Sequence, residues 1–435
     1  MNWEELCKDK IVSVKEAVSK IKSGDRVVLA PGAGEAVELM KALVENKENY
    51  KDVEIDHMLP IGKCEYAQPG MEKYFKYNSL FVGGGSRDAV NSGRADYTPC
   101  FFYEIPRMFK EGYLPVDVAL VQLSVPDEHG FCSLGVSNTY IKGALECAKI
   151  VIAEINENTP RVLGDCSIHV SDIDYMVKTS YPIPEMKKPN IGEIEKAIGK
   201  YCASLVEDGS TLQLGIGAIP DAVLLFLKDK KDLGIHSELI SDGVVELAKA
   251  GVITNKRKTI HKGKSVVAFF MGTKKLYDYI DDNPMVESYP VDYVNDPRVI
   301  MQNYKMVSIN SCVEIDLMGQ VCAESIGRKQ ISGVGGQIDF IRGTSMAKDG
   351  KSIIAMPSTA AKGKVSRIVP LLQTGTPVTT SRNDINYVVT EYGIAQLKGK
   401  TLKQRAEALI NIAHPKFREE LIAAYEETFK CSYKK

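Results

Sequence analysis

The 435-residue chain lacks several features that mark particular classes of protein. None of its cysteines forms a CxxC pair, which disfavours a zinc ribbon or a redox dithiol. No histidines stand at metal-ligand spacing with a carboxylate, and neither an HExxH nor a Gly-x-Ser-x-Gly motif occurs. A metalloenzyme and a serine hydrolase therefore have little support. No apolar run reaches the roughly 18 residues that a membrane span requires.

Basic and acidic residues are also nearly equal in number. Lys and Arg number 55 and Asp and Glu 56, giving a net charge of −1. A nucleic-acid-binding protein usually shows a basic excess, so we expect neither a nucleic-acid nor a membrane partner. The segment Met1-Asn2-Trp3-Glu4-Glu5 has neither the basic nor the apolar region of a signal peptide. Because scattered cysteines are typical of reduced thiols, we expect a cytoplasmic protein.

Short β-branched runs alternate along the chain with longer amphipathic segments. This alternation predicts an α/β fold with mostly parallel sheets. The expected strands are Arg26–Ala30, Val53–Met58, Val116–Leu123, Ile150–Glu154, Thr211–Leu214, Ser265–Phe270, Met306–Asn310 and Ile353–Met356. The expected helices are Ser13–Ser23, Ala36–Asn46, Ile194–Leu205, Asp221–Lys228 and Leu402–Asn411.

A weak internal repeat suggests two similar α/β halves. The strand and Gly-rich turn that begin at Gly24 resemble those that begin at Gly209, an offset of 209 − 24 = 185. The acidic turn around Gly130 resembles that around Gly319, an offset of 319 − 130 = 189. Chance similarity of short glycine turns is the alternative. Because a Pro-rich segment, 181–189, separates the halves, we expect domains at 1–185 and 190–435.

A glycine-rich turn, Gly215-Ile216-Gly217-Ala218-Ile219, follows an expected strand and precedes an expected helix. Glycines allow close approach of a ligand, and the N–H groups of a helix N-terminus attract anions. A dinucleotide fingerprint requires a third glycine where this chain has Pro220, which disfavours a dinucleotide site without excluding other anions. An ordinary strand-to-helix turn remains the structural alternative.

A second signal is the segment His236–Val245, in which Glu238 stands beside apolar residues. In a helix Glu238 and Asp242 would share a face, whereas in a strand Glu238 would share a face with Ile240. A glutamate in such a setting is a candidate nucleophile or acid/base. Local sequence alone favours the simpler interpretation of a surface carboxylate that caps a turn.

Three further segments are rich in small residues. Ser332–Phe340 includes three glycines within four positions, an arrangement that can direct N–H groups at a developing oxyanion. Phe81–Arg87 is similar and adds a cation, and Ser358–Lys364 contributes two ammonium groups. Each segment on its own is more often a simple loop.

These residues together resemble the family I coenzyme A transferases, in the acetyl-CoA hydrolase/transferase branch. The likeness covers nearly the whole chain and is strongest over 192–413. Ordered blocks carry it: Gln213–Asp221, Ile235–Val245, Met271–Thr273, Pro290–Tyr293, Ser332–Phe340, Thr380–Asp384 and Thr390–Ile394. The resemblance implies two similar open α/β domains with the active site between them, and a homodimer.

The family's residues map onto this chain by motif. The resemblance implies Glu238 as the catalytic nucleophile, and N–H groups near Ile219 and Gly336 as an oxyanion hole. The implied coenzyme A contacts are Gly215, Ile216, Gly217, Ala218, Ile219, Ser332, Gly336 and Lys362. Pro31 departs from the pattern, because relatives that act on 4-hydroxybutyrate have a histidine there.

The implied activity is transfer of coenzyme A between a short-chain acyl-CoA and a carboxylate. The expected acyl group is 4-hydroxybutyryl or butyryl, the expected acceptor is acetate, and a glutamyl-CoA thioester is the expected intermediate. No metal or separate cofactor is expected, since coenzyme A is a substrate. Hydrolysis of acyl-CoA at the same site remains an alternative. A dinucleotide-dependent oxidoreductase and a purely structural or binding role are less well supported.

Overall fold

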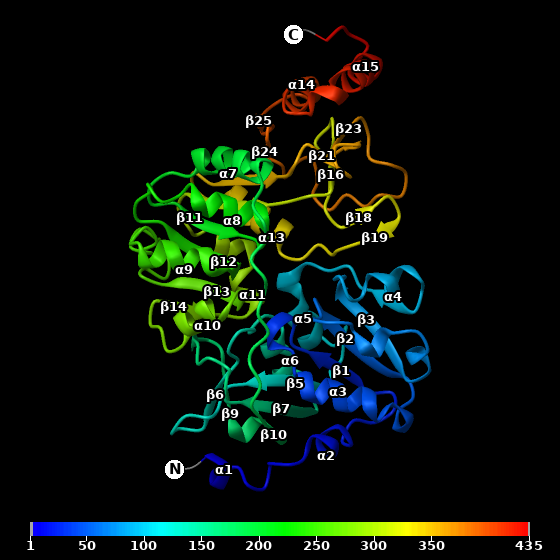
Figure 1. Ribbon diagram of the computed structural model, residues 1–435, viewed down its shortest axis with the longest axis vertical. Coiled ribbons are helices and arrows are strands. Elements are labelled where there is room, and N and C mark those ends of the chain that lie inside the picture. Colours follow the sequence, from blue (N-terminus) through cyan, green and yellow to red (C-terminus); the bar gives the residue numbers. More distant parts are fainter. Residues whose placement is uncertain (1–2, 434–435) are drawn as a thin grey trace. The chain divides into compact units, whose positions relative to one another are not determined.

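The computed structural model describes residues 3–433 (Figure 1). By their contacts these residues form two compact units. The first unit comprises residues up to Lys187 together with Ser265–Asn295 and Ile331–Gly335. The second comprises Lys188–Lys264, Asp296–Gln330 and the chain from Gly336 onward. The boundary expected between residues 185 and 190 stays a prediction.

The first unit is built on a seven-stranded sheet in the order β10-β7-β5-β1-β2-β3-β4, in which every pairing is parallel. Its strands are β1 (Arg26–Leu29), β2 (Val53–Met58), β3 (Phe75–Phe81), β4 (Ala95–Tyr97), β5 (Val118–Leu123), β7 (Ile150–Asn156) and β10 (Tyr175–Thr179). Strands β13 (Ser265–Phe270), β14 (Val286–Ser288) and β8 (Leu163–Gly164) pair in parallel, and β6 (Phe131–Ser133) pairs antiparallel with β9 (Ser167–His169). The helices are α1 (Trp3–Leu6), α2 (Val14–Val18), α3 (Val37–Glu45), α4 (Arg87–Asn91), α5 (Ile105–Lys110), α6 (Ile141–Cys147), α10 (Lys274–Ile280) and α11 (Val291–Val294).

The second unit contains strands in the order β25-β24-β20-β15-β11-β12, parallel except for the β24–β25 hairpin. These are β11 (Thr211–Leu214), β12 (Gly234–Ile240), β15 (Met306–Asn310), β20 (Lys351–Ala355), β24 (Tyr387–Thr390) and β25 (Gly393–Gln396). Small sheets are formed by β16 (Glu314–Asp316), β17 (Val321–Cys322) and β23 (Ile368–Val369), by β18 (Ser325–Ile326) with β19 (Lys329–Gln330), and by β21 (Thr359–Ala360) with β22 (Val365–Ser366). The helices are α7 (Glu193–Leu205), α8 (Ala218–Leu225), α9 (Asp242–Lys249), α12 (Pro297–Ile300), α13 (Gln337–Met346), α14 (Leu402–Asn411) and α15 (Arg418–Phe429).

The mixed α/β fold with mostly parallel sheets is confirmed. Strands β2, β11, β13 and β15 and helix α14 have the predicted bounds. The start of α14 is marked by its N-cap Thr401. Helix α2 ends at Val18, five residues before the predicted Ser23. Helix α8 begins at Ala218 and not at Asp221, because Pro220 fits the first helical turn, where no N–H is needed.

Each sheet reverses its direction of winding at one central strand. From β1 the chain proceeds through β2, β3 and β4 on one side, while β5, β7 and β10 lie on the other. In the second unit, β11 occupies the same place between β12 and β15. Right-handed crossovers send the loops after such neighbouring strands in opposite directions, which leaves a crevice at the carboxyl ends of the strands.

The acidic turns predicted to repeat have the same hydrogen bonds. Asp127 Oδ1 accepts the N–H groups of His129 and Phe131 at 2.9 and 2.8 Å. Asp316 Oδ1 accepts those of Met318 and Gln320 at 3.0 and 2.9 Å. The glycine in each turn has a positive φ, +83° at 130 and +90° at 319. The offset of 189 therefore reflects a repeated backbone turn.

The turns that precede β1 and β11 are also equivalent. The N–H of Gly24 donates to the carbonyl of Lys51 at 3.0 Å, and that of Gly209 to Lys231 at 2.9 Å. Both glycines have positive φ, at +84° and +76°. The two central strands therefore begin in the same way, 185 residues apart. Among residues 3–433, no helix is long and apolar enough to cross a membrane.

The acidic turn predicts a measurable contribution to stability. Asp316 is fully buried, so Asp316→Ala leaves two backbone N–H groups without their acceptor and should lower the free energy of unfolding by about 1–3 kcal/mol. Asp316→Asn keeps the Oδ1 acceptor and should retain most of the free energy of unfolding. Urea denaturation measures the change, with Asp229→Ala at an exposed position as the control. Equal stability of the Asp316→Ala and control variants would contradict the role of this turn.

Candidate active site

Glu238 lies near the carboxyl end of β12 and is half-buried. Its neighbour Leu239 pairs with Leu214, the last residue of β11, after a shift in register. The segment is therefore extended, and helix α9 begins only at Asp242. The sequence left open whether Glu238 lies in a helix or in a strand. The structure has the strand, so Glu238 and Asp242 do not share a helical face.

The predicted glycine-rich turn lies beside this glutamate. It runs from Gly215 directly after β11, and Gly217 forms the N-cap of α8 with φ +117° and ψ −174°, a conformation open essentially to glycine only. The first N–H groups of α8, at Ala218 and Ile219, have no acceptor within the helix. Adjacent parallel strands thus bring the turn and Glu238 together at one edge of the sheet.

Two amide side chains that the sequence analysis did not identify share the face of Glu238. Strand alternation and the β11–β12 and β11–β15 registers place Gln213 and Asn310 on that face. The two amides bond reciprocally, at 3.1 and 3.4 Å. The signal that could have found them is an amide residue near the carboxyl end of each of two neighbouring strands, Gln213 in β11 and Asn310 in β15.

Gly336 is buried and forms the N-cap of α13, which packs against β15 and β20 in the second unit. Ser332, four residues earlier, groups with the first unit. There Arg87 Nε donates to the carbonyl of Ile331 at 2.6 Å, and a Cβ added at Gly333 would lie 2.9 Å from the Phe81 ring. The cation of the Phe81–Arg87 loop is therefore used to anchor the Ser332 segment.

Lys362 lies at the tip of the β21–β22 hairpin, where Ala361, Lys362 and Gly363 all have positive φ. Its side chain is exposed, so its ammonium group is accessible to an anion. The start of the hairpin is fixed by Glu391, whose carboxylate accepts the Ser358 N–H at 2.8 Å and its hydroxyl at 2.6 Å. The catalytic and coenzyme A-binding roles of the named residues stay predictions.

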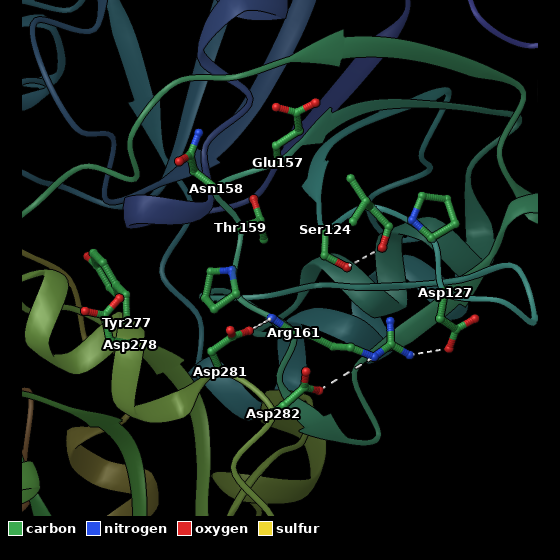
Figure 2. A pocket seen from close by; sticks show the side chains of 13 residues that line it. Ser124, Asp127, Glu157, Asn158, Thr159, Arg161, Tyr277, Asp278, Asp281 and Asp282 are labelled. Atoms are coloured by element: carbon green, nitrogen blue, oxygen red, sulfur yellow. Dashed lines mark hydrogen bonds and ion pairs between the residues drawn. The ribbon is translucent and has the colours of Figure 1, made fainter. Parts of the chain in front are cut away.

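A pocket of about 370 Å³ in the first unit contains none of the predicted site residues (Figure 2). It lies beyond the carboxyl ends of β5 and β7, and residues at and just after the end of α10 form part of its lining. Its residues are Ser124, Val125, Pro126, Asp127, Glu157, Asn158, Thr159, Pro160, Arg161, Tyr277, Asp278, Asp281 and Asp282. Five carboxylates against one guanidinium make it unsuitable for the phosphates of coenzyme A.

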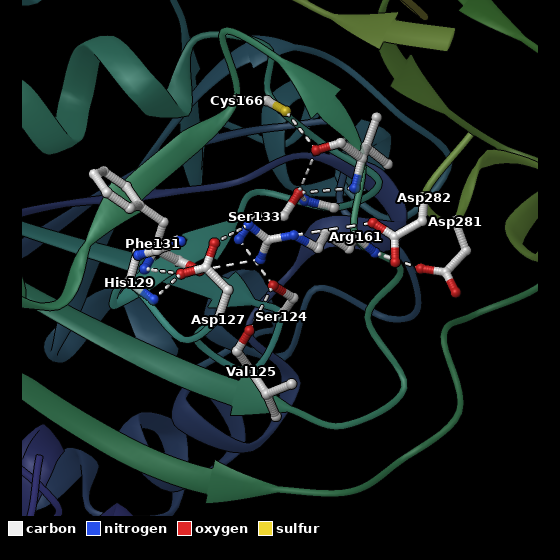
Figure 3. Close-up of polar contacts among 12 residues, drawn as sticks. Ser124, Val125, Asp127, His129, Phe131, Ser133, Arg161, Cys166, Asp281 and Asp282 are labelled. Atoms are coloured by element: carbon white, nitrogen blue, oxygen red, sulfur yellow. Dashed lines mark hydrogen bonds and ion pairs between the residues drawn. The ribbon is translucent and has the colours of Figure 1, made fainter. Parts of the chain in front are cut away.

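The one arginine of this pocket is already engaged. The Arg161 guanidinium is paired with Asp127 and lies 4.0 Å from Asp282, while its backbone N–H donates to Asp281 at 2.7 Å (Figure 3). The guanidinium also donates a hydrogen bond to the carbonyl of Phe131 at 3.1 Å. This cation therefore joins loops within the first unit. Within the described residues, no group of three His, Cys, Asp or Glu side chains is placed to hold a metal ion.

Two models of one known family match this chain. The acetyl-CoA hydrolase/transferase N-terminal domain matches residues 1–184, and the C-terminal domain of the same family matches residues 272–425. The chain therefore belongs to the acetyl-CoA hydrolase/transferase family. It is an enzyme of the CoA-transferase class, as the sequence analysis expected.

Several relatives are similar over their full lengths. The chain is 68% identical to 4-hydroxybutyrate coenzyme A transferase of Clostridium kluyveri, covering 99% of this chain and 100% of the relative. It is 40% identical to butyryl-CoA:acetate CoA-transferase of Anaerostipes caccae, covering 98% of each. Among solved structures, 4-hydroxybutyrate CoA-transferase of Porphyromonas gingivalis is 43% identical with a TM-score of 0.84, covering 99% of each chain. RipA of Yersinia pestis is 38% identical with a TM-score of 0.94, covering 99% of this chain and 100% of RipA.

The conformation of Gly217 predicts a specific effect of adding a methyl group. No heavy atom lies within 4 Å of an added Cβ, so Gly217→Ala should act through backbone strain, which costs about 1–3 kcal/mol. We expect the turn to relax and the Kd for coenzyme A to rise about tenfold, measured by isothermal titration calorimetry.

Gly251→Ala is the matched control for this substitution. Gly251 has φ +76° and equally open surroundings, but it follows the C-terminus of α9, away from the carboxyl ends of the strands. Its replacement should leave coenzyme A affinity unchanged. Equal effects of the two variants would show that the Gly217 turn does not bind coenzyme A.

Proposed function

We propose that this chain transfers coenzyme A between a short-chain acyl-CoA and a carboxylate such as acetate, through a glutamyl-CoA thioester on Glu238. The observation that supports this proposal best is the half-buried Glu238 beside the glycine-rich N-terminus of α8. A carboxylate nucleophile and N–H donors for an oxyanion are thereby available on adjacent strands. Relatives at 68% and 40% identity are named as transferases of this kind.

The first half of the reaction moves coenzyme A onto the enzyme. A carboxylate oxygen of Glu238 attacks the thioester carbonyl carbon, the C–S bond breaks, and the coenzyme A thiolate leaves. The thiolate then attacks the glutamyl carbonyl of the resulting mixed anhydride. The bond between the glutamyl carbonyl carbon and the bridging anhydride oxygen breaks, so that the oxygen leaves with the acyl group as the first carboxylate and glutamyl-CoA remains.

The second half repeats these steps in reverse order with a new carboxylate. Each step passes through a tetrahedral oxyanion, which the N–H groups of Ile219 and Gly336 are proposed to stabilise. Each such donor is worth about 3–4 kcal/mol in other enzymes that use an oxyanion hole. Transfer also requires that water be kept from the anhydride and the thioester. Coenzyme A is then a substrate that is returned in every cycle.

The proposed acyl group is 4-hydroxybutyryl or butyryl. The names of the two relatives above favour these, and both acyl chains contain four carbons. Pro31 is buried at the end of β1 and offers no side-chain hydrogen bond to a hydroxyl group. Butyryl and 4-hydroxybutyryl thioesters are therefore the substrates to compare first. The homodimer and the cytoplasmic location remain predictions.

The covalent intermediate gives a direct test of Glu238. Treatment with butyryl-CoA and then borohydride should modify the peptide that contains Glu238, as found by mass spectrometry. Glu238→Gln and Glu238→Asp should each lower kcat on the order of 10³-fold, because the nucleophile is lost or displaced by one methylene. Glu246→Gln, on the exposed face of α9, should retain activity. Modification at another residue, or none, would refute the mechanism.

Transfer and hydrolysis differ in their need for an acceptor. With butyryl-CoA alone we expect one equivalent of glutamyl-CoA and little turnover, and with added acetate we expect continuous formation of acetyl-CoA. The measurement follows acyl-CoA species by chromatography. Free coenzyme A that accumulates at full rate without acetate would establish the hydrolase alternative instead.

A further inference from the structure

The loop after β1 and the loop after β2 lie side by side at the carboxyl edge of the first unit's sheet. The β1 loop contains the short helix Gly32–Gly34 and then Glu35. The β2 loop, which we define as Leu59–Cys64, joins β2 to the turn Glu65–Ala67. Because β1 is the strand at which the winding reverses, its loop borders the crevice where ligands bind in such sheets.

The β2 loop has an unusual backbone. Leu59, Gly62 and Cys64 have φ values of +50°, +91° and +53°, and for leucine and cysteine this region is unfavourable. A backbone of this kind persists only when its surroundings hold it. The backbone of the loop also approaches Gly85 closely, since a Cβ added at Gly85 would lie 2.7 Å from the carbonyl oxygen of Gly62.

Glu35 supplies one of the bonds that hold this loop. Its Oε2 accepts the N–H of Ile61 at 3.1 Å, near the exposed tip of the loop. At the base, the N–H of Gly32 donates to the carbonyl of Leu59 at 3.2 Å. The β1 loop itself is fixed, because Gln122 Nε2 donates to the carbonyls of Ala33 and Glu35, both at 3.3 Å. Glu35 therefore connects a fixed loop to a strained one.

The surroundings of Glu35 do not favour a carboxylate. Burial, together with the nearby Glu65 and Glu154 carboxylates, raises the pKa of Glu35 to about 7 against the opposing effect of the Ile61 N–H. Above neutral pH the folded protein therefore holds a charge at an electrostatic cost. A neutral acceptor such as glutamine would avoid this cost while keeping a hydrogen bond to the Ile61 N–H.

The side chains near this connection suit an aliphatic ligand. Leu59 is half-buried and Ile61 is 38% exposed, and Met271 Sδ lies 3.5 Å from the position of an added Cβ at Gly32. A short acyl chain would bury apolar area against these residues, and the position of Ile61 would set how long a chain fits.

We propose that Glu35 is a positioning residue, whose carboxylate holds the β2 loop through the Ile61 N–H and thereby sets which short acyl chain the enzyme accepts. This role rests on the proposed function and adds to it a determinant of acyl selectivity. Glu35 itself takes no part in the covalent steps. Its loss should therefore alter acyl selectivity and the mobility of one loop, while single-turnover formation of glutamyl-CoA at saturating butyryl-CoA persists.

The experiment compares Glu35→Ala and Glu35→Gln with the wild type and with Glu45→Gln, an exposed glutamate at the end of α3. The first readout is the rate of limited trypsin cleavage after Lys63, which is exposed within the β2 loop, relative to cleavage after the exposed Arg257. The second is kcat/KM for acetyl-, butyryl- and hexanoyl-CoA. Thermal unfolding at pH 8 is recorded for every variant.

Loss of a hydrogen bond to a charged group should raise cleavage after Lys63 about tenfold in Glu35→Ala and change the butyryl-to-hexanoyl ratio of kcat/KM about as much. Glu35→Gln keeps an acceptor oxygen and should show smaller changes in both readouts. Since its amide carries no charge, it should unfold at the same or a higher temperature than the wild type at pH 8. Glu45→Gln should match the wild type throughout.

The proposal would be overturned if Glu35→Gln and Glu35→Ala were both cleaved after Lys63 at the wild-type rate. It would also be overturned by faster cleavage with an unchanged butyryl-to-hexanoyl ratio of kcat/KM. If Glu35→Ala fails to fold, the test rests on Glu35→Gln, which should fold because its neutral amide removes the unfavourable charge. A wild-type protein that transfers no coenzyme A would refute the proposed function and the selectivity role together. The cleavage rates would still decide whether Glu35 holds the loop.

Discussion

The handedness of strand crossovers is the constraint on which the rest of the structure depends. Because a parallel sheet built by right-handed crossovers can grow on either side of its first strand, β1 and β11 each become central, with neighbours wound in opposite directions. Loops that leave the carboxyl ends of these strands cannot cover the edge completely. The Gly215–Ile219 turn and the Gly32–Glu35 loop both lie at such an edge, one in each unit.

The chemistry proposed at β12 depends on the backbone conformation at the carboxyl edge of the sheet. The extended backbone of β12 fixes Glu238, and its face is shared with the Gln213–Asn310 amide pair. The adjacent helix N-terminus has donors without intrahelical acceptors, and Pro220 occupies a position in the first turn where a missing N–H costs little. A nucleophile and its oxyanion donors can therefore be rigid without a metal ion or a long catalytic loop between them.

Much of this could be predicted from local sequence, and the reasons are physical. Short segments that contain β-branched and other apolar residues gave the bounds of β2, β11, β13 and β15. The glycine turns revealed the repeat, since their positive φ values restrict the residues that fit. Local sequence could not decide whether Glu238 is extended or helical, because apolar residues suit both. It also gave no indication that Ser265–Asn295 would group with the first unit or that Arg87 would bind Ile331, since both depend on contacts far apart in the chain. The family resemblance, and not the periodicity, identified Glu238.

The repeat allows the loop after β1 to be compared with the turn after β11, residue by residue. With the offset of 185, Gly32 corresponds to Gly217, and both have positive φ. Three residues on, Glu35 corresponds to Pro220. In the second unit the proline removes a donor and leaves the N–H groups before it for a ligand. In the first unit the glutamate accepts an N–H from the neighbouring loop. In the proposed function, equivalent positions of the repeat therefore have different tasks: the second unit offers N–H donors to an oxyanion, and the first unit holds a strained loop that selects the acyl chain.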